Sequence, residues 1–427
     1  MSRLAARLNG GANPKLGATD PSRSFYRYYA GFSENFVEDL LPLLTKDKSA
    51  VVLDPWNGTG TTTAVSARCG YQSIGIDRNP VLVAIATARG VSAKSADVYL
   101  RRLGERLRRS TPFEAATSKD PLSNWFGRKF VETFRGLQHE ALGRGGVDRA
   151  EPIAANAFSA AHSIAHVVFF RVARRFAYPV FGSNPTWISR RPLERRISVP
   201  AAVLLHVVRE EIEALRIHYS RFGNTSELAP QIILGDSTSL GSSLMGDAIG
   251  AIITSPPYGT RIDYAMAMAI ELACLEPFAV FDFNALRRQL IGTTLTSHVE
   301  TAVTPMWGPG ALDFLGSVRA HRSKASAAYY SRYYENYFAA LFQSLTSIHQ
   351  IAGRGVSAAF VVQGSFYKEI YLDLASVTTE MLQGLGWQSS ARVDREVMIS
   401  FTLLNPASRH YPKSHRPVES VLVLRKR

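Results

Sequence analysis

Hydrophobic residues near the start of the chain follow the pattern of buried strands alternating with helices. Short apolar runs at Ala50 to Pro55 and Gln72 to Asp77 predict strands, because a strand buried on both faces is a near-continuous apolar segment. Each run is followed by a segment of helical periodicity, Thr61 to Cys69 and Asn79 to Arg89. This strand, helix, strand, helix order predicts a parallel sheet.

A second run of the same type begins at Gln231 and continues to the end of the chain. Its predicted elements are strands Gln231 to Leu234 and Ala251 to Thr254, helices Tyr264 to Leu275 and Tyr333 to Ile351, strand Val356 to Gln363, a helix near Ile370 to Leu385, and strands Val397 to Leu403 and Val418 to Leu424. The last two strands predict an antiparallel pair at one edge of the sheet. Both runs together make about seven strands, so we expect an α/β fold with a doubly wound, Rossmann-like sheet.

Between the two runs the strand signal disappears. Over residues 95–227, apolar residues recur at helical spacing, which predicts a mostly helical insertion. The core is thereby divided into a first part at 23–94 and a second part at 228–427. Within the second part, residues 291–328 carry glycine and proline with little periodicity and predict an irregular loop. Residues 1–22 predict a disordered arm.

Composition and charge narrow the class of protein. The 427 residues include 49 Lys and Arg against 35 Asp and Glu, and the formal net charge of +14 attracts polyanions such as nucleic acid. The insertion, with 21 basic and 13 acidic residues, supplies +8 of this charge. No apolar run is long enough for a membrane-spanning helix, and two cysteines cannot form a disulfide framework. We therefore expect a cytoplasmic protein without membrane partners.

The first candidate for chemistry is the segment Asp54-Pro55-Trp56-Asn57-Gly58-Thr59-Gly60-Thr61, which lies between a predicted strand and a predicted helix. Its glycines allow a tight turn close to a ligand, and the helix start offers free N–H groups. The next strand ends in Asp77, where a carboxylate can accept hydrogen bonds from ribose hydroxyls. The glycine patterns of nicotinamide enzymes and of phosphate-binding loops are absent. The segment therefore predicts a nucleoside cofactor without a pyrophosphate.

The second candidate is Thr254-Ser255-Pro256-Pro257-Tyr258-Gly259, again at the end of an apolar strand. Two consecutive prolines remove two N–H donors, so that nearby oxygens can accept hydrogen bonds without local competition. The Ser255 hydroxyl and the Pro256 carbonyl can hold the hydrogens of an exocyclic base amine and direct its lone pair toward an electrophile. Tyr258 can stack on a base that has left its helix. The alternative is an ordinary proline-containing strand end.

In this order, the two segments resemble the motifs of the S-adenosylmethionine-dependent amino-methyltransferases of DNA, D-P-F-x-G-x-G-T and (S/D/N)-P-P-(Y/F/W). The resemblance covers residues 23–90 and 230–427. It implies a seven-stranded methyltransferase sheet, S-adenosyl-L-methionine as cofactor and DNA as partner. The catalytic residues that it implies are Ser255, Pro256, Pro257 and Tyr258. The cofactor-binding residues that it implies are Phe32, Asp54, Pro55, Trp56, Gly58, Gly60, Thr61, Asp77 and Asp236.

The target base follows from the first residue of the second motif. Serine at this position is typical of N4-cytosine enzymes, whereas aspartate or asparagine is typical of N6-adenine enzymes, so Ser255 favours cytosine N4 and adenine N6 is the alternative. Carbon-5 methylation requires a cysteine nucleophile, usually after proline, and neither Cys69 nor Cys274 follows one. An RNA amino-methyltransferase and a non-catalytic nucleic-acid-binding module are further alternatives. A restriction or defence-system protein is a candidate partner, and no metal is expected.

The arginine-rich part of the insertion, Arg171 to Arg196, is the candidate nucleic-acid surface, because its arginines are interleaved with aromatic residues. The alternative is an aromatic core with a solvated arginine face. Arg261, directly after the second motif, can bind a phosphate beside the target base, or can be solvated at a helix start capped by Asp263. The predicted nucleic-acid-binding residues are Arg174, Arg175, Arg190, Arg191, Arg261, Arg322 and Lys324.

Overall fold

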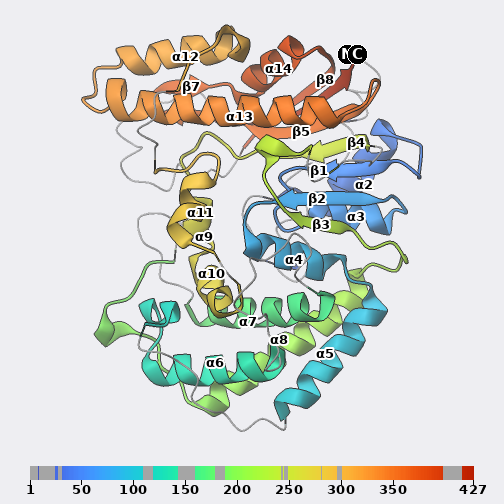
Figure 1. Ribbon diagram of the computed structural model, residues 1–427, viewed down its shortest axis with the longest axis vertical. Helices are drawn as coiled ribbons and strands as arrows, with labels where there is room; N and C mark the ends of the chain where they lie inside the picture. Colours follow the sequence, from blue (N-terminus) through green and yellow to red (C-terminus); the bar gives the residue numbers. More distant parts are fainter. Residues whose placement is uncertain are drawn as a thin grey trace.

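A twisted seven-stranded sheet lies in the upper part of the molecule (Figure 1). The computed structural model describes residues 8, 25–26, 31–108, 119–142, 159–177, 188–241, 244, 249–279, 281–295, 301–397 and 416–427. The strands are β1 (Val51–Asp54), β2 (Ser73–Asp77), β3 (Gln231–Leu234), β4 (Ile249–Thr254), β5 (Ser357–Gln363), β8 (Trp387–Glu396) and β9 (Val418–Lys426). Their order is β3-β2-β1-β4-β5-β9-β8. β9 runs in the opposite direction to the other six strands, so it pairs antiparallel with β5 and with β8.

Helices cover both faces of this sheet, as in a doubly wound fold. On one face, α2 (Glu34–Leu44) and α3 (Thr61–Arg68) pack against alternate residues of the central strands, such as Val52 and Ile253. On the other face, α12 (Pro309–Ala320), α13 (Ser331–Ile351) and α14 (Leu374–Gly384) pack against the residues in between, such as Leu53 and Ile252. The α/β fold class is confirmed. An antiparallel pair closes one edge of the sheet, but β9 forms it with β8 and not with the strand predicted at 397–403. A small hairpin of β6 (Ser365–Tyr367) and β7 (Ile370–Leu372) lies beside the sheet.

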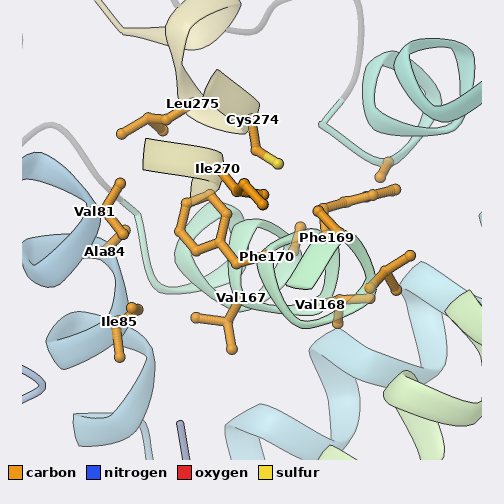
Figure 2. Packing of buried hydrophobic residues seen from close by; sticks show 14 of the residues in the cluster. Val81, Ala84, Ile85, Val167, Val168, Phe169, Phe170, Ile270, Cys274 and Leu275 are labelled. Carbon is orange, nitrogen blue, oxygen red and sulfur yellow. The ribbon is translucent and has the colours of Figure 1, made fainter. Parts of the chain in front are cut away.

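Residues 95–227 contribute a helical layer below the sheet, composed of α5 (Ala93–Arg108), α6 (Arg128–Leu142), α7 (Ala160–Ala177) and α8 (Ala201–Phe222). A column of helices, α9 (Tyr264–Ala267), α10 (Ala269–Leu275) and α11 (Phe283–Gln289), lies between the two layers (Figure 1). The layers share one apolar core with α4 (Pro80–Gly90). Figure 2 shows Phe170 of α7 between Ala84 of α4 and Ile270 of α10. The helical layer is therefore packed firmly on the sheet unit.

Three sequence predictions differ from the structure. The edge strand expected at 397–403 is instead β8, and residues 398–403 lie outside the described residues. The segment 291–328 contains the regular helix α12, which Pro309 begins at a position where its missing N–H costs nothing. Of the predicted arm, the structure describes Leu8, which is 6% exposed and whose carbonyl accepts from Arg395. Leu8 is thus part of the core.

One buried ion pair holds the helical layer to the column. Arg135 of α6, 1% exposed, donates two hydrogen bonds to Asp120 at 2.7 and 2.9 Å. It also donates to the carbonyls of Ala273 and Cys274 in α10, at 2.7 and 2.9 Å. Every polar atom of this guanidinium group thus has a partner.

We expect Arg135→Met to lower the free energy of unfolding by about 3–5 kcal/mol, because Asp120 would keep a buried charge without its partner. The matched control is Arg128→Met on the same helix, because Arg128 is 87% exposed and pairs with Glu132 one turn away. The control should change stability by about 0.5 kcal/mol or less. Denaturant unfolding of the two variants measures both effects, and equal losses would contradict the role of the buried pair.

Candidate active site

The glycine turn after β1 is shaped by its contact with α4. Gly58 and Gly60 have φ values of +52° and +78°, a region that favours glycine. A Cβ atom on Gly60 would lie 2.8 Å from Cβ of Ala86, so a larger residue would collide with α4. Gly60 is the residue directly before α3. The turn can therefore bring the start of α3 and the backbone of Gly58 close to the end of β1.

Asp77, the last residue of β2, binds this turn directly. Its two carboxylate oxygens accept hydrogen bonds from the backbone N–H groups of Gly58 at 2.9 Å and Asn79 at 2.8 Å. Burial raises the pKa of Asp77 from its ordinary 3.8 to about 7, and the nearby carboxyl of Asp54 adds to the rise. Asp77 is thus a half-buried carboxyl at the carboxyl ends of the parallel strands, where doubly wound sheets bind ligands.

Asp54 lies beneath the turn and is 2% exposed. Its Oδ1 accepts from the Thr254 hydroxyl at 2.5 Å and from the Trp56 backbone N–H at 3.1 Å. Burial raises the pKa of Asp54 to about 6. Because Thr254 directly precedes Ser255, Asp54 connects the two motifs at their bases.

The second motif leaves β4 at the same edge of the sheet. The Ser255 hydroxyl lies 2.8 Å from the Val361 carbonyl of β5 and 3.1 Å from the Tyr258 hydroxyl. A carbonyl can only accept, so the single hydroxyl proton of Ser255 is directed to Val361, and a lone pair of its oxygen remains for another donor. The Tyr337 hydroxyl donates to the Pro257 carbonyl at 2.8 Å. Among the described residues, none donates a hydrogen bond to the Pro256 carbonyl.

A cleft lies between the two motifs. Nine of the predicted site residues line it: Pro55, Trp56, Gly58, Asp77, Asp236, Ser255, Pro256, Pro257 and Tyr258. Four predicted cofactor residues, Phe32, Asp54, Gly60 and Thr61, are absent from its lining. Asp54 and Gly60 shape the turn from behind, and Thr61 accepts a hydrogen bond from Arg89 at 2.8 Å.

Phe32, predicted to bind the cofactor, packs against α2. Its ring packs edge-on against Phe36, with ring centroids 5.7 Å apart, and contacts the core on the α2 face of the sheet. The family resemblance implied a place beside the cofactor for this residue, and Phe32 does not line the cleft. The structure assigns it to the packing of α2 instead.

The cleft also contains residues that the sequence analysis missed, including Arg78, Asn79, Tyr264 and Gln289. Arg78 forms an ion pair with Asp236, and its Nε donates to the Gln289 side chain at 3.3 Å. Arg78 and Asn79 follow Asp77 directly, so proximity to the strand end was an available signal for both. Gln289 ends α11, in a segment without any motif, and nothing in the sequence marks it.

Two arginines of the predicted nucleic-acid surface have acidic partners. Arg174 forms an ion pair with Glu271, which is 0% exposed and accepts a hydrogen bond from Tyr26 at 2.5 Å. Arg175 pairs with Glu210 at 2.7 Å and Glu211 at 3.3 Å. The charges of Arg174 and Arg175 are thus balanced by glutamates within the protein, and phosphate binding by these two arginines stays a prediction.

Arg261, predicted to bind a phosphate, lies in a cluster of tyrosine rings. Its guanidinium carbon lies 5.5, 4.6 and 5.9 Å from the ring centroids of Tyr329, Tyr330 and Tyr333. Its backbone N–H donates to the Tyr333 hydroxyl at 3.0 Å, and its φ is +57°. Asp263 caps α9, as the alternative proposed, and also pairs with Arg287 at 2.7 Å. Arg261 thus anchors the end of the second motif in a tyrosine cluster.

The remaining predicted nucleic-acid residues lie outside the cleft. Arg190, Arg322 and Lys324 are exposed, and Arg191 is half-buried. Tyr178, Phe181 and Trp187, which suggested base stacking, lie outside the described residues. Cys274 is fully buried and burial raises the pKa of its thiol, while Cys69 is absent from the cleft lining. Neither cysteine is placed to act as a nucleophile.

The cleft fits a nucleoside cofactor with charged groups. Asp77 offers carboxylate oxygens at one side, and Trp56 offers an aromatic face. Trp56 Nε1 and Asn79 Nδ2 are buried donors without a hydrogen-bond partner, and both residues line the cleft. Unsatisfied buried donors are rare and are available to a ligand. In the part of the chain that the structure describes, no group of three His, Cys, Asp or Glu could hold a metal ion.

The sheet order, the reversed strand β9 and a cleft at the carboxyl ends of the strands define a doubly wound, Rossmann-like α/β fold. Residues 11–88 match the family model described as DNA methylase, of the N6 and N4 methyltransferases. The predicted resemblance to the DNA amino-methyltransferases is thus confirmed, and it rests on the segment that contains Asp54 to Asp77. The family match ends before the second motif begins.

A curated relative is the Type II methyltransferase M.BsoBI of Geobacillus stearothermophilus, 38% identical over 58 residues, which are 14% of this chain and 11% of the relative. The match therefore spans about a tenth of that relative's length. Two structures of the rRNA methyltransferase aviRa from Streptomyces viridochromogenes align over 96% of both chains at 11% and 13% identity. Their TM-score of 0.30 is too low to support any argument about fold or substrate. Among the described helices, none has the length and apolarity to span a membrane.

Proposed function

We propose that this protein is a DNA methyltransferase that transfers a methyl group from S-adenosylmethionine to the exocyclic N4 amine of a cytosine. The observation that carries the proposal is that Ser255 and Asp77 line the same cleft. Its proton is directed to Val361, so the oxygen is an acceptor for an amine hydrogen. The family match over residues 11–88 supports DNA as the substrate class.

When bound, S-adenosylmethionine supplies a methyl group that its sulfonium already activates. Asp77 would accept hydrogen bonds from the ribose hydroxyls of the cofactor, and Trp56 Nε1 and Asn79 Nδ2 would donate to its polar atoms. The Ser255 hydroxyl and the Pro256 carbonyl each accept a hydrogen bond from the target amine. These two hydrogen bonds direct the lone pair of the amine into the cleft. Tyr258 stacks on the target base after the base leaves the duplex. The chain thus acts by positioning, and one amine proton is released to solvent as the new bond forms.

The test is a product analysis. Purified protein is incubated with S-adenosylmethionine and unmethylated duplex DNA or RNA, and the digested nucleosides are separated by mass spectrometry. We expect N4-methylcytosine in DNA. N6-methyladenine would keep the mechanism and replace the base assignment, because both a hydroxyl and a carboxylate can accept from an amine. Product in RNA alone, or no product with any substrate, would contradict the proposal.

A further inference from the structure

The loop of the second motif is held by tyrosine hydroxyl groups. The Tyr337 hydroxyl donates to the Pro257 carbonyl at 2.8 Å, and the Tyr264 hydroxyl accepts from the Tyr258 backbone N–H at 3.2 Å. The Pro257 carbonyl and the Tyr258 N–H belong to one planar peptide unit. Two tyrosines therefore hold both polar groups of this peptide.

The loop and α13 remain in close contact beyond this peptide. The Arg261 N–H donates to the hydroxyl of Tyr333, which lies one turn before Tyr337 on α13, at 3.0 Å. Gly259 permits the approach, because a Cβ atom there would lie 3.4 Å from Cε1 of Tyr337 and 2.9 Å from Cδ2 of Leu372. The Tyr337 ring is therefore packed directly on the loop.

The direction of the Pro256 carbonyl depends on the held peptide. Both Pro256 and Pro257 line the cleft. The ring of Pro257 fixes its φ at about −65°, so that one soft dihedral angle, ψ of Pro257, separates the Pro256 carbonyl from the held peptide. Because it precedes a proline, Pro256 is itself restricted to extended backbone conformations. The Pro256 carbonyl thus keeps its direction as long as the Pro257 carbonyl is held.

Tyr337 lies behind the loop and does not line the cleft. Its side chain is 1% exposed and is absent from the cleft lining. Burial raises the pKa of Tyr337 well above its ordinary 10, so the hydroxyl keeps its proton near neutral pH and remains a donor. Any effect of this hydroxyl on a ligand in the cleft must therefore pass through the loop.

We propose that Tyr337 is a positioning residue that directs the Pro256 carbonyl toward the target amine. Methyl transfer to nitrogen depends on geometry, and a displacement of about 1 Å at the reacting groups can cost about 10² in rate. Without the Tyr337 hydroxyl, the Pro257 carbonyl loses its donor and the peptide can rotate about ψ of Pro257. This inference rests on the proposed function, because the Pro256 carbonyl is assumed to accept from the amine.

The experiment uses Tyr337→Phe, which removes the hydroxyl and keeps the ring. We expect single-turnover methylation to be about thirtyfold slower than in the wild type, with a Kd for S-adenosylmethionine within about twofold of the wild-type value. Tyr334→Phe is the matched control, because Tyr334 is 2% exposed on the same helix. Among the described residues, no hydrogen bond joins its hydroxyl to the loop at 255–261. The control should retain at least about half of the wild-type rate.

A double variant distinguishes positioning from a general effect on stability. Ser255 and the Pro256 carbonyl hold the same amine, and groups that act as a unit give losses that do not multiply. In the Ser255→Ala background, we therefore expect Tyr337→Phe to slow transfer by about threefold at most, whereas independent effects would give the full thirtyfold loss again.

Amide hydrogen exchange measures the hold on the loop without any methyl transfer. We expect the N–H groups of Tyr258 and Arg261 to exchange about tenfold faster in Tyr337→Phe than in the wild type, and at the wild-type rate in Tyr334→Phe. Unchanged exchange in Tyr337→Phe, equal losses of rate in the two variants, or a full loss in the Ser255→Ala background would overturn the inference. If the wild type methylated no base while Tyr337→Phe still loosened the loop, the proposed function would fail and the hold of Tyr337 on the loop would stand.

Discussion

Ser255→Ala is expected to lower the rate of methyl transfer at least a hundredfold while cofactor affinity stays within about twofold of the wild-type value. The Ser255 oxygen is a fixed acceptor at the cleft, because its proton is directed to the Val361 carbonyl at 2.8 Å. Without this oxygen, the target amine loses one of two acceptors that hold its hydrogens, and its lone pair is no longer directed. Loss of one well-placed polar group of this kind costs about 10²–10³ in kcat.

The measurement pairs single-turnover methylation with calorimetric titration of S-adenosylmethionine. Ser365→Ala is the matched control, since Ser365 is a nearby buried serine whose hydroxyl donates to the Gly259 carbonyl just after the same loop, at 3.3 Å. It does not line the cleft, so near-normal transfer is expected. If both variants lost activity equally, the effect would come from the stability of the loop. Retention of more than half of the wild-type rate in Ser255→Ala would refute the acceptor role.

The central strands could be predicted because they have no polar side. Val51 to Asp54 and Ile249 to Thr254 are buried almost throughout, so hydrophobicity alone locates them. The edge strand β8 could not be located in this way. Its sequence, Trp-Gln-Ser-Ser-Ala-Arg-Val-Asp-Arg-Glu, has exposed polar residues at most positions, because one face and one edge of this strand meet solvent. The strand was predicted at Val397 to Leu403 instead, because that segment is apolar.

The residues of the cleft could be predicted where a motif specifies them and not where distant segments meet. Pro55 to Gly58 and Ser255 to Tyr258 lie at adjacent strand ends, and parallel strands bring such ends together. Gln289 reaches the cleft through the packing of α11, which no local pattern encodes. The ion pairs of the arginines could not be predicted for a related reason. Composition reports the charge of Arg174 but cannot reveal Glu271, its partner 97 residues later.

Asp77 makes cofactor binding depend on pH. Burial raises its pKa from 3.8 to about 7, so the carboxyl of the free protein gains a proton as the pH falls through neutrality. Ribose hydroxyls donate to the ionised form, and therefore the Kd for S-adenosylmethionine should rise about tenfold for each pH unit below 7. Titrations between pH 5.5 and 8.5 measure this slope. Asp77→Asn should bind more weakly than the wild type above pH 7, and its affinity should change little across the range.

The stability of the free protein should rise as the pH falls, whereas cofactor affinity should fall. These opposite trends distinguish titration of Asp77 from a general loss of stability in acid. The pKa of Asp77 is higher in the folded than in the unfolded protein, so its carboxyl contributes stability that is fully present below about pH 4. This stability is lost as the pH rises through 7, because the unfolded protein loses the proton first. Relative to the wild type, Asp77→Asn should therefore become more stable between pH 5 and pH 8 in denaturant unfolding. A wild-type Kd that is flat from pH 6 to pH 8, or a stability difference of opposite slope, would show that Asp77 is ionised throughout and that burial does not control its charge.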